Sequence, residues 1–151
     1  MREMLALAAG MAVLAASQPG AAQTQAGWSY AYVEGVATAT QRDQRGRVTA
    51  TLTCRPPTGD IVISDYTLVR AARRATSSAV RIGAMSVTVP SSVQGNGRNR
   101  ALTINLPQRP PILAAVQPSD QLSVTVNNQT HTYLDGGPLR MKEVAYACWG
   151  S

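Results

Sequence analysis

Apolar and hydroxyl-bearing side chains alternate along four short stretches of this 151-residue chain. In residues 48–54 (VTATLTC), three threonines alternate with apolar side chains and a cysteine. The same period of two recurs in residues 85–89, 102–106 and 122–126. Successive side chains of a strand point to opposite faces of a sheet, so this pattern is typical of half-buried antiparallel strands. The alternation therefore restricts the chain to a mainly β fold.

Shorter segments add to these strands. Residues 61–63 (IVI) are apolar throughout and predict a more central strand, and Tyr30 and Tyr32 indicate a weaker first strand. Asn96-Gly97 is a strong hairpin signal. Residues 65–76 combine helical spacing with strand composition, and we expect an irregular stretch that leads from a strand into a loop.

The periodicity changes near the C-terminus. Met141, Val144, Ala145 and Cys148 follow one another at i, i+3, i+4 and i+7, the spacing of one helix face. Pro138 stands near the start of this segment, where a missing N–H costs little. The expected fold is a small antiparallel sandwich or a curled sheet with a short C-terminal helix.

The first residues have the composition of a secretory signal peptide. Arg2 precedes the apolar run 4–16, and small residues stand at −3 and −1 before Gln23. A spanning helix needs about 20 apolar residues, and this run is shorter. We therefore predict a signal peptide over residues 1–22 and a single β-rich domain over 23–151. No second long apolar run follows, so we expect no membrane span in the mature chain and a periplasmic or secreted location.

Export changes how the two cysteines are interpreted. In an oxidising compartment, two cysteines most simply form one disulfide, so we predict a bond between Cys54 and Cys148 that joins the helix to a strand. A reactive thiol is the alternative, but the chain has no C-x-x-C motif. One histidine and two cysteines are too few for a zinc site built from His and Cys alone. We expect no metal and no cofactor.

Basic residues exceed acidic residues by 14 to 8, and Arg makes up nearly all of the basic set. The candidate polyanion-binding residues form three clusters: Arg42, Arg45 and Arg47; Arg70, Arg73 and Arg74; Arg98 and Arg100. Arg forks match phosphate and carboxylate groups, and the alternative is a solvated positive surface. The predicted export argues against intracellular nucleic acid and favours an envelope polyanion or a protein as the partner.

Catalytic groups are scarce. His131 is the only imidazole, and no G-x-S-x-G elbow is present. Most of the acids stand beside turn signals, where Asp caps turns. Our leading hypothesis is a non-catalytic exported domain that binds a cell-envelope component or a partner protein. The alternatives are an inhibitor of a hydrolase acting through residues 95–99, and a weak hydrolase centred on His131.

Several local motifs occur in a familiar order. Gly27-Trp28-Ser29 opens the mature region and Leu52-Thr53-Cys54 ends a strand; residues 112–115 and 119–124 follow, and the last helix ends near Cys148. This layout resembles small, Sec-exported, single-disulfide proteins of alphaproteobacteria. The resemblance implies a compact β-rich periplasmic domain and supplies no catalytic residues.

Overall fold

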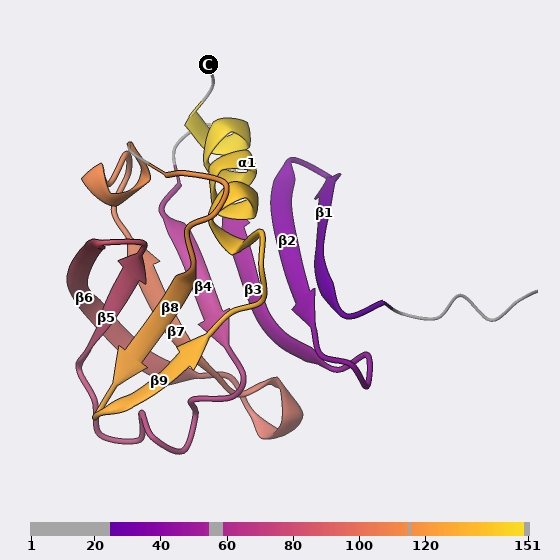
Figure 1. The fold of residues 1–151 in the computed structure, drawn as a ribbon. Helices are drawn as coiled ribbons and strands as arrows, with labels where there is room; N and C mark the ends of the chain where they lie inside the picture. The colour runs from indigo at the N-terminus through magenta and orange to yellow at the C-terminus, as the bar shows by residue number, and fades with distance from the viewer. Residues whose placement is uncertain (1–24, 55–58, 115, 150–151) are drawn as a thin grey trace, which may run out of the picture.

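A computed structural model describes residues 25–54, 59–114 and 116–149, and its fold is mainly β (Figure 1). Nine antiparallel strands form one sheet in the order β1-β2-β3-β4-β7-β6-β5-β8-β9. The strands are β1 (Gly27–Val33), β2 (Val36–Arg42), β3 (Val48–Cys54), β4 (Ile61–Asp65), β5 (Ser77–Ile82), β6 (Met85–Gln94), β7 (Ala101–Leu106), β8 (Leu122–Val126) and β9 (Gln129–Thr132). This sheet curls into a half-barrel. Of the two predicted arrangements, the curled sheet is therefore the one that forms.

The inner face of the half-barrel holds the core. Leu52 of β3, Ile63 of β4, Ile104 of β7 and Val124 of β8 are fully buried, while the neighbouring threonines and serines of these strands face outward. The four alternating stretches thus form strands as predicted. The 61–63 strand lies in the interior of the sheet, between β3 and β7.

One of two connections differs in detail from its sequence signal. Strands β6 and β7 pair as a hairpin, but the Asn96-Gly97 signal does not form a two-residue turn. The chain makes a short 3-10 helix there instead, η1 (Gly97–Asn99). Residues 66–76 leave β4 through a series of turns, as expected for the irregular stretch.

The helix α1 (Gly137–Trp149) covers the inner side of β1, β2 and β3 (Figure 1). Its predicted face is confirmed, because Met141, Val144, Ala145 and Cys148 are all buried. Cys148 forms the predicted disulfide with Cys54 at the end of β3, with the two Cα atoms 5.8 Å apart. The disulfide therefore joins the last helix to an interior strand.

Strand direction gives the molecule two distinct ends. Strands β2, β4, β6 and β8 run toward the lower end of Figure 1, and the connections that follow them lie there. The upper end carries α1, the β5–β6 turn and a second 3-10 helix, η2 (Pro111–Leu113).

None of the helices within the described ranges is long and apolar enough to cross a membrane. The predicted signal peptide, residues 1–22, lies outside the described residues and stays a prediction.

Candidate functional site

The three predicted arginine clusters lie at the same end of the sheet. Arg42 ends β2, and the β2–β3 turn carries Arg45 and Arg47. The connection after β4 carries Arg70, Arg73 and Arg74, and the β6–β7 connection carries Arg98 and Arg100. Each cluster follows a strand that runs toward the lower end in Figure 1. We call this group of eight residues the arginine end.

The strand register shows that these segments are neighbours. Arg42 pairs with Val48 across β2 and β3, and Ala50 of β3 pairs with Asp65, the last residue of β4. Asp65 pairs in turn with Leu102 of β7. The end of each strand therefore lies beside the end of the next, and the connections that carry the arginines are adjacent.

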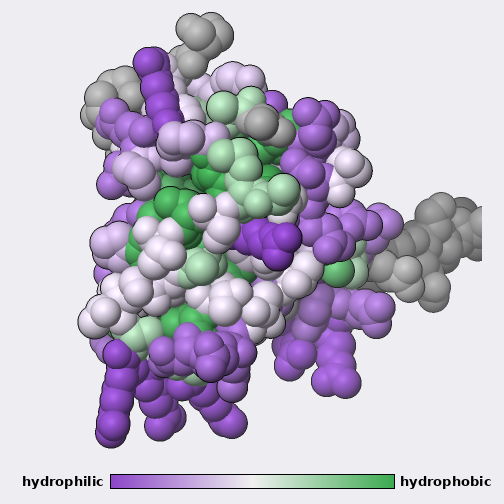
Figure 2. Space-filling view, turned by 60° about the vertical axis from the view of Figure 1, so that its left-hand side comes forward, coloured by the Kyte–Doolittle hydropathy of each residue, from purple (hydrophilic) through white to green (hydrophobic). Residues whose placement is uncertain are grey.

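The arginine end is exposed and almost free of opposing charge. All of its arginines are exposed except Arg42, which is half-buried. Figure 2 shows long hydrophilic side chains that project from the lower end. Only Asp43 and Asp65 supply negative charge in these segments, and both already have partners. Clustered like charges of this kind produce a strong local potential.

The turn that carries Arg45 and Arg47 is fixed by Asp43. Its carboxylate accepts hydrogen bonds from the backbone N–H of Arg45 at 2.8 Å and of Arg47 at 2.9 Å, and it pairs with the Arg47 guanidinium at 2.8 Å. The backbone hydrogen bond from Arg47 is the main cause that lowers the pKa of Asp43. The prediction that Asp residues beside turn signals cap turns is confirmed here.

The segment after β4 is anchored in the core. Leu68 and Ala72 are buried and alternate with the exposed Arg70, Arg73 and Arg74. The side-chain amide of Asn127, in the β8–β9 turn, donates to the carbonyl of Ala71 at 2.9 Å. The backbone that presents these arginines is therefore held from both sides.

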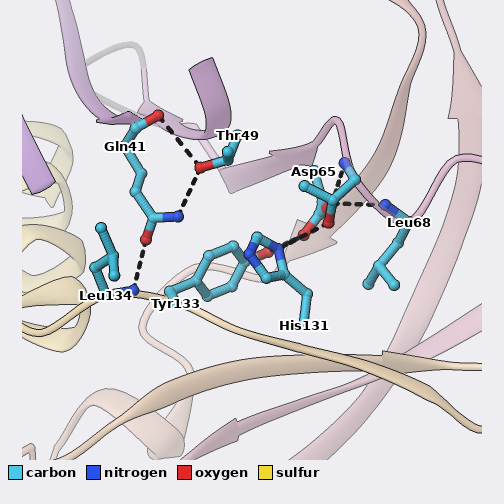
Figure 3. A network of polar contacts seen from close by, with 8 residues as sticks. Gln41, Thr49, Asp65, Leu68, His131, Tyr133 and Leu134 are labelled. Carbon is cyan, nitrogen blue, oxygen red and sulfur yellow. Dashed lines mark hydrogen bonds and ion pairs between the residues drawn. The ribbon is translucent and has the colours of Figure 1, made fainter. Parts of the chain in front are cut away.

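Just inside the arginine end lies a polar network centred on Asp65, which is fully buried (Figure 3). One carboxylate oxygen accepts hydrogen bonds from the Thr67 N–H, the Thr67 hydroxyl and the Leu68 N–H at 2.7–2.9 Å. The other faces Nδ1 of His131 at 2.6 Å and accepts from the Tyr133 hydroxyl at 2.8 Å. Asp65 therefore caps a turn, as predicted, and also joins β4 to β9.

Burial and hydrogen bonding act in opposite directions on the pKa of Asp65. Burial alone would raise this pKa, but the hydrogen bond and charge of His131, with the hydrogen bonds from Thr67 and Tyr133, lower it below 3.8. Burial, followed by the nearby Asp65 charge, raises the pKa of Tyr133 well above 10. The network therefore favours an ionised Asp65 and a neutral Tyr133.

His131 lies on the short edge strand β9, as its alternating neighbours indicated. Its Nδ1 faces Asp65, and the Thr67 hydroxyl lies 3.0 Å from the same nitrogen. Among the described residues, no hydroxyl hydrogen-bonds to Nε2 of His131. The pair thus has the orientation of a histidine and its supporting carboxylate, without a nucleophile at the other nitrogen in the described part of the chain.

The chain that leaves β9 is fastened to the opposite edge of the half-barrel. The backbone N–H of Leu134 donates to the side-chain oxygen of Gln41 on β2 at 2.8 Å, and the Trp28 indole of β1 donates to the Leu134 carbonyl at 3.0 Å. The Trp28 and Tyr133 rings meet edge to face. Together with the Asp65 network, these contacts join β9 and the chain after it to β4, β2 and β1, and Figure 3 shows those made by Asp65 and Gln41.

The 95–99 loop proposed for an inhibitor also lies at the arginine end. Gly95 has φ +83° and packs so closely on the Asn99 carbonyl that a side chain there would collide with it. The Asn99 N–H donates to the Asn96 carbonyl at 3.0 Å. The loop is thus a compact, exposed turn that contains Arg98 and precedes Arg100. Across the described ranges, no three His, Cys, Asp or Glu side chains group closely enough to hold a metal ion.

The chain matches no known protein-family model, no curated protein and no solved structure.

Proposed function

We propose that the protein is an exported binding domain whose arginine end binds an anionic polymer of the cell envelope. One observation carries the proposal. Three arginine clusters that are separated in the sequence share one end of the sheet, and the two acids of that end are already occupied by Arg47 and His131.

The chemistry of the arginine end suits a phosphate- or carboxylate-bearing polymer. A guanidinium donates two parallel hydrogen bonds to such a group. Arginines spread over three connections can contact several groups of one polymer, and linked contacts strengthen binding beyond that of each contact alone. The anchoring of these connections by Asp43, Leu68, Ala72 and Asn127 reduces the entropy lost on binding.

Two observations support an exported, non-catalytic role. The Cys54–Cys148 disulfide is typical of oxidising compartments such as the periplasm. His131, the one candidate base, is committed to the Asp65 network that holds β4 and β9 together.

A binding measurement tests the proposal. Fluorescence anisotropy with labelled polyphosphate should show binding at low ionic strength that weakens steeply as salt is added, because Debye screening shortens the range of exposed charges. A neutral dextran of similar length is the control. Lipopolysaccharide should bind, and its enzymatically dephosphorylated form should bind more weakly. Equal binding of polyphosphate and dextran, or no binding of polyphosphate at low salt, would overturn the proposal.

A further inference from the structure

The upper end of the molecule carries an apolar pocket between η2 and α1. Its volume is about 190 Å³. Pro111 and Leu113 line the η2 side, and Ala145 and Trp149 line the α1 side. Because an apolar cavity of about 150 Å³ holds benzene, this pocket can accommodate one aromatic ring or one branched aliphatic side chain.

Two cations stand at the same pocket. Arg109 and Lys142 both contribute to its lining, and neither forms an ion pair with a described residue. Glu143, the acid next to Lys142, is already paired with Arg140 at 2.6 Å. Arg109 also has φ +49°, a left-handed conformation that non-glycine residues adopt at a cost and that occurs often at ligand sites. An anion attached to an apolar group would complement this combination.

Apolar surface continues from the pocket along α1. Tyr146, at the pocket, is 60% exposed, and Leu139 is 41% exposed. Residues 139, 142 and 146 follow at i, i+3 and i+7, so they share one helix face. At about 1.5 Å per residue, Leu139 and Tyr146 lie about 10 Å apart along the helix axis, a length that about three residues of an extended polypeptide span. In Figure 2, hydrophobic residues gather in the upper half of the molecule.

We propose that this pocket binds the C-terminal residue of a partner polypeptide. An aromatic or branched side chain fills the pocket, and the terminal carboxylate lies against Arg109 and Lys142. The preceding residues run along the face formed by Leu139 and Tyr146. A C-terminal residue fits because its α-carbon carries both a carboxylate and a side chain. The pocket offers two cations to the carboxylate and an apolar cavity to the side chain. The site lies at the opposite end from the arginine end and is independent of it.

The two tryptophans provide a direct test by NMR. Trp149 lines the pocket, and its indole N–H donates to the Gly59 carbonyl at 3.4 Å. The Trp28 indole donates to the Leu134 carbonyl elsewhere in the fold. Titration with the peptide Ac-Gly-Ser-Gly-Phe should shift the Trp149 indole resonance and leave that of Trp28 in place. The same peptide with a C-terminal amide should bind at least about tenfold more weakly, because it lacks the charge-assisted hydrogen bonds of the carboxylate.

Matched variants distinguish the loss of a contact in the pocket from a general change in the net charge of the protein. Arg109→Gln and Lys142→Met should each weaken binding of the acid peptide about fivefold or more. Arg81→Gln, which removes one charge from β5 outside the pocket and leaves the Arg140–Glu143 pair in place, should change binding less than about twofold. Equal affinity for acid and amide, or no Trp149 shift at millimolar peptide, would overturn the proposal. If 3-phenylpropionate binds as tightly as the peptide, the pocket takes small carboxylic acids and the polypeptide partner is refuted.

Discussion

Nδ1 of His131 lies 2.6 Å from a carboxylate oxygen of Asp65, although the two residues are 66 positions apart in the sequence. Asp65 ends an interior strand, and His131 lies on the edge strand β9. The contact therefore spans the concave side of the half-barrel, where Tyr133 and Leu134 continue the same line of contacts toward β2 and β1. This line of contacts closes the sheet, so its loss should be visible in stability.

The Asp65→Asn variant should be destabilised by about 2–4 kcal/mol. The buried carboxylate accepts several hydrogen bonds, whereas the amide of Asn would turn its NH₂ group, a donor, toward some of the same N–H and O–H donors. Urea unfolding followed by circular dichroism measures the change. Asp43→Asn is the matched control, since Asp43 caps a turn in the same way but on the surface. Similar losses in the two variants would show that turn capping, and not the link to β9, accounts for the effect.

Acid should weaken the fold through Asp65. The pKa of Asp65 is lower in the folded chain than its ordinary value of 3.8, so its stabilising contribution is present above about pH 4 and is lost as the pH falls through the folded-state pKa. Unfolding free energies measured between about pH 6 and pH 2 should decline in the wild type. In Asp65→Asn the decline should be smaller, and an identical decline would contradict this role.

Alkali should weaken the fold through Tyr133. Its pKa is raised well above 10 in the folded chain, so unfolding releases a proton once the pH exceeds about 10, and stability falls as the pH rises further. Tyr133→Phe should flatten this alkaline loss while costing about 1 kcal/mol at neutral pH for the hydrogen bond to Asp65. Tyr32→Phe is the control, because Tyr32 is 54% exposed and Tyr133 is kept. A decline of equal steepness in Tyr133→Phe would rule out this assignment.

The Cys54–Cys148 bond closes a sequence separation of 94 residues. The loop-entropy relation gives such a bond up to about 4–5 kcal/mol. Reduction, or the double variant Cys54→Ala/Cys148→Ala, should therefore lower the urea midpoint strongly. Mass spectrometry of the exported protein should find the two cysteines linked. An unchanged midpoint after complete reduction would contradict the proposed contribution.

The clearest strand predictions come from segments with strong contrast between the two faces, whereas residues 61–63 are predicted from their uniformly apolar composition. In β3, β7 and β8, threonine or serine alternates with larger apolar residues, so the period of two is visible. The sequence does not predict strand β2, because the inner residues of this strand are Ala37, Ala39 and Gln41. Alanine has a low strand propensity, and glutamine side chains are mostly exposed in proteins, so neither residue predicts the buried face of a strand. Only the pairing with β1 and β3 fixes this segment as a strand.

Site residues were predictable to different degrees. The arginine clusters were visible as three local groups, but their meeting at one end depends on the direction of each strand. The pairing of Asp65 with His131 has no local signal, because it depends on the sheet curling until β9 faces β4. Gln41 and Leu134 are brought together by the same closure.

The central claim is that the arginine end forms a binding site, and charge-matched variants test it most directly. Arg73→Gln/Arg74→Gln removes two charges from the arginine end, whereas Arg81→Gln/Arg140→Gln removes two charges from β5 and α1, so both variants lower the formal net charge of +6 by two. Polyphosphate affinity should fall about five- to thirtyfold in the first variant, at about 0.5–1 kcal/mol or more per lost contact. It should fall less than about twofold in the second. Equal losses in the two variants would show that net charge alone attracts the polymer, and the account of a binding site at the arginine end would be wrong.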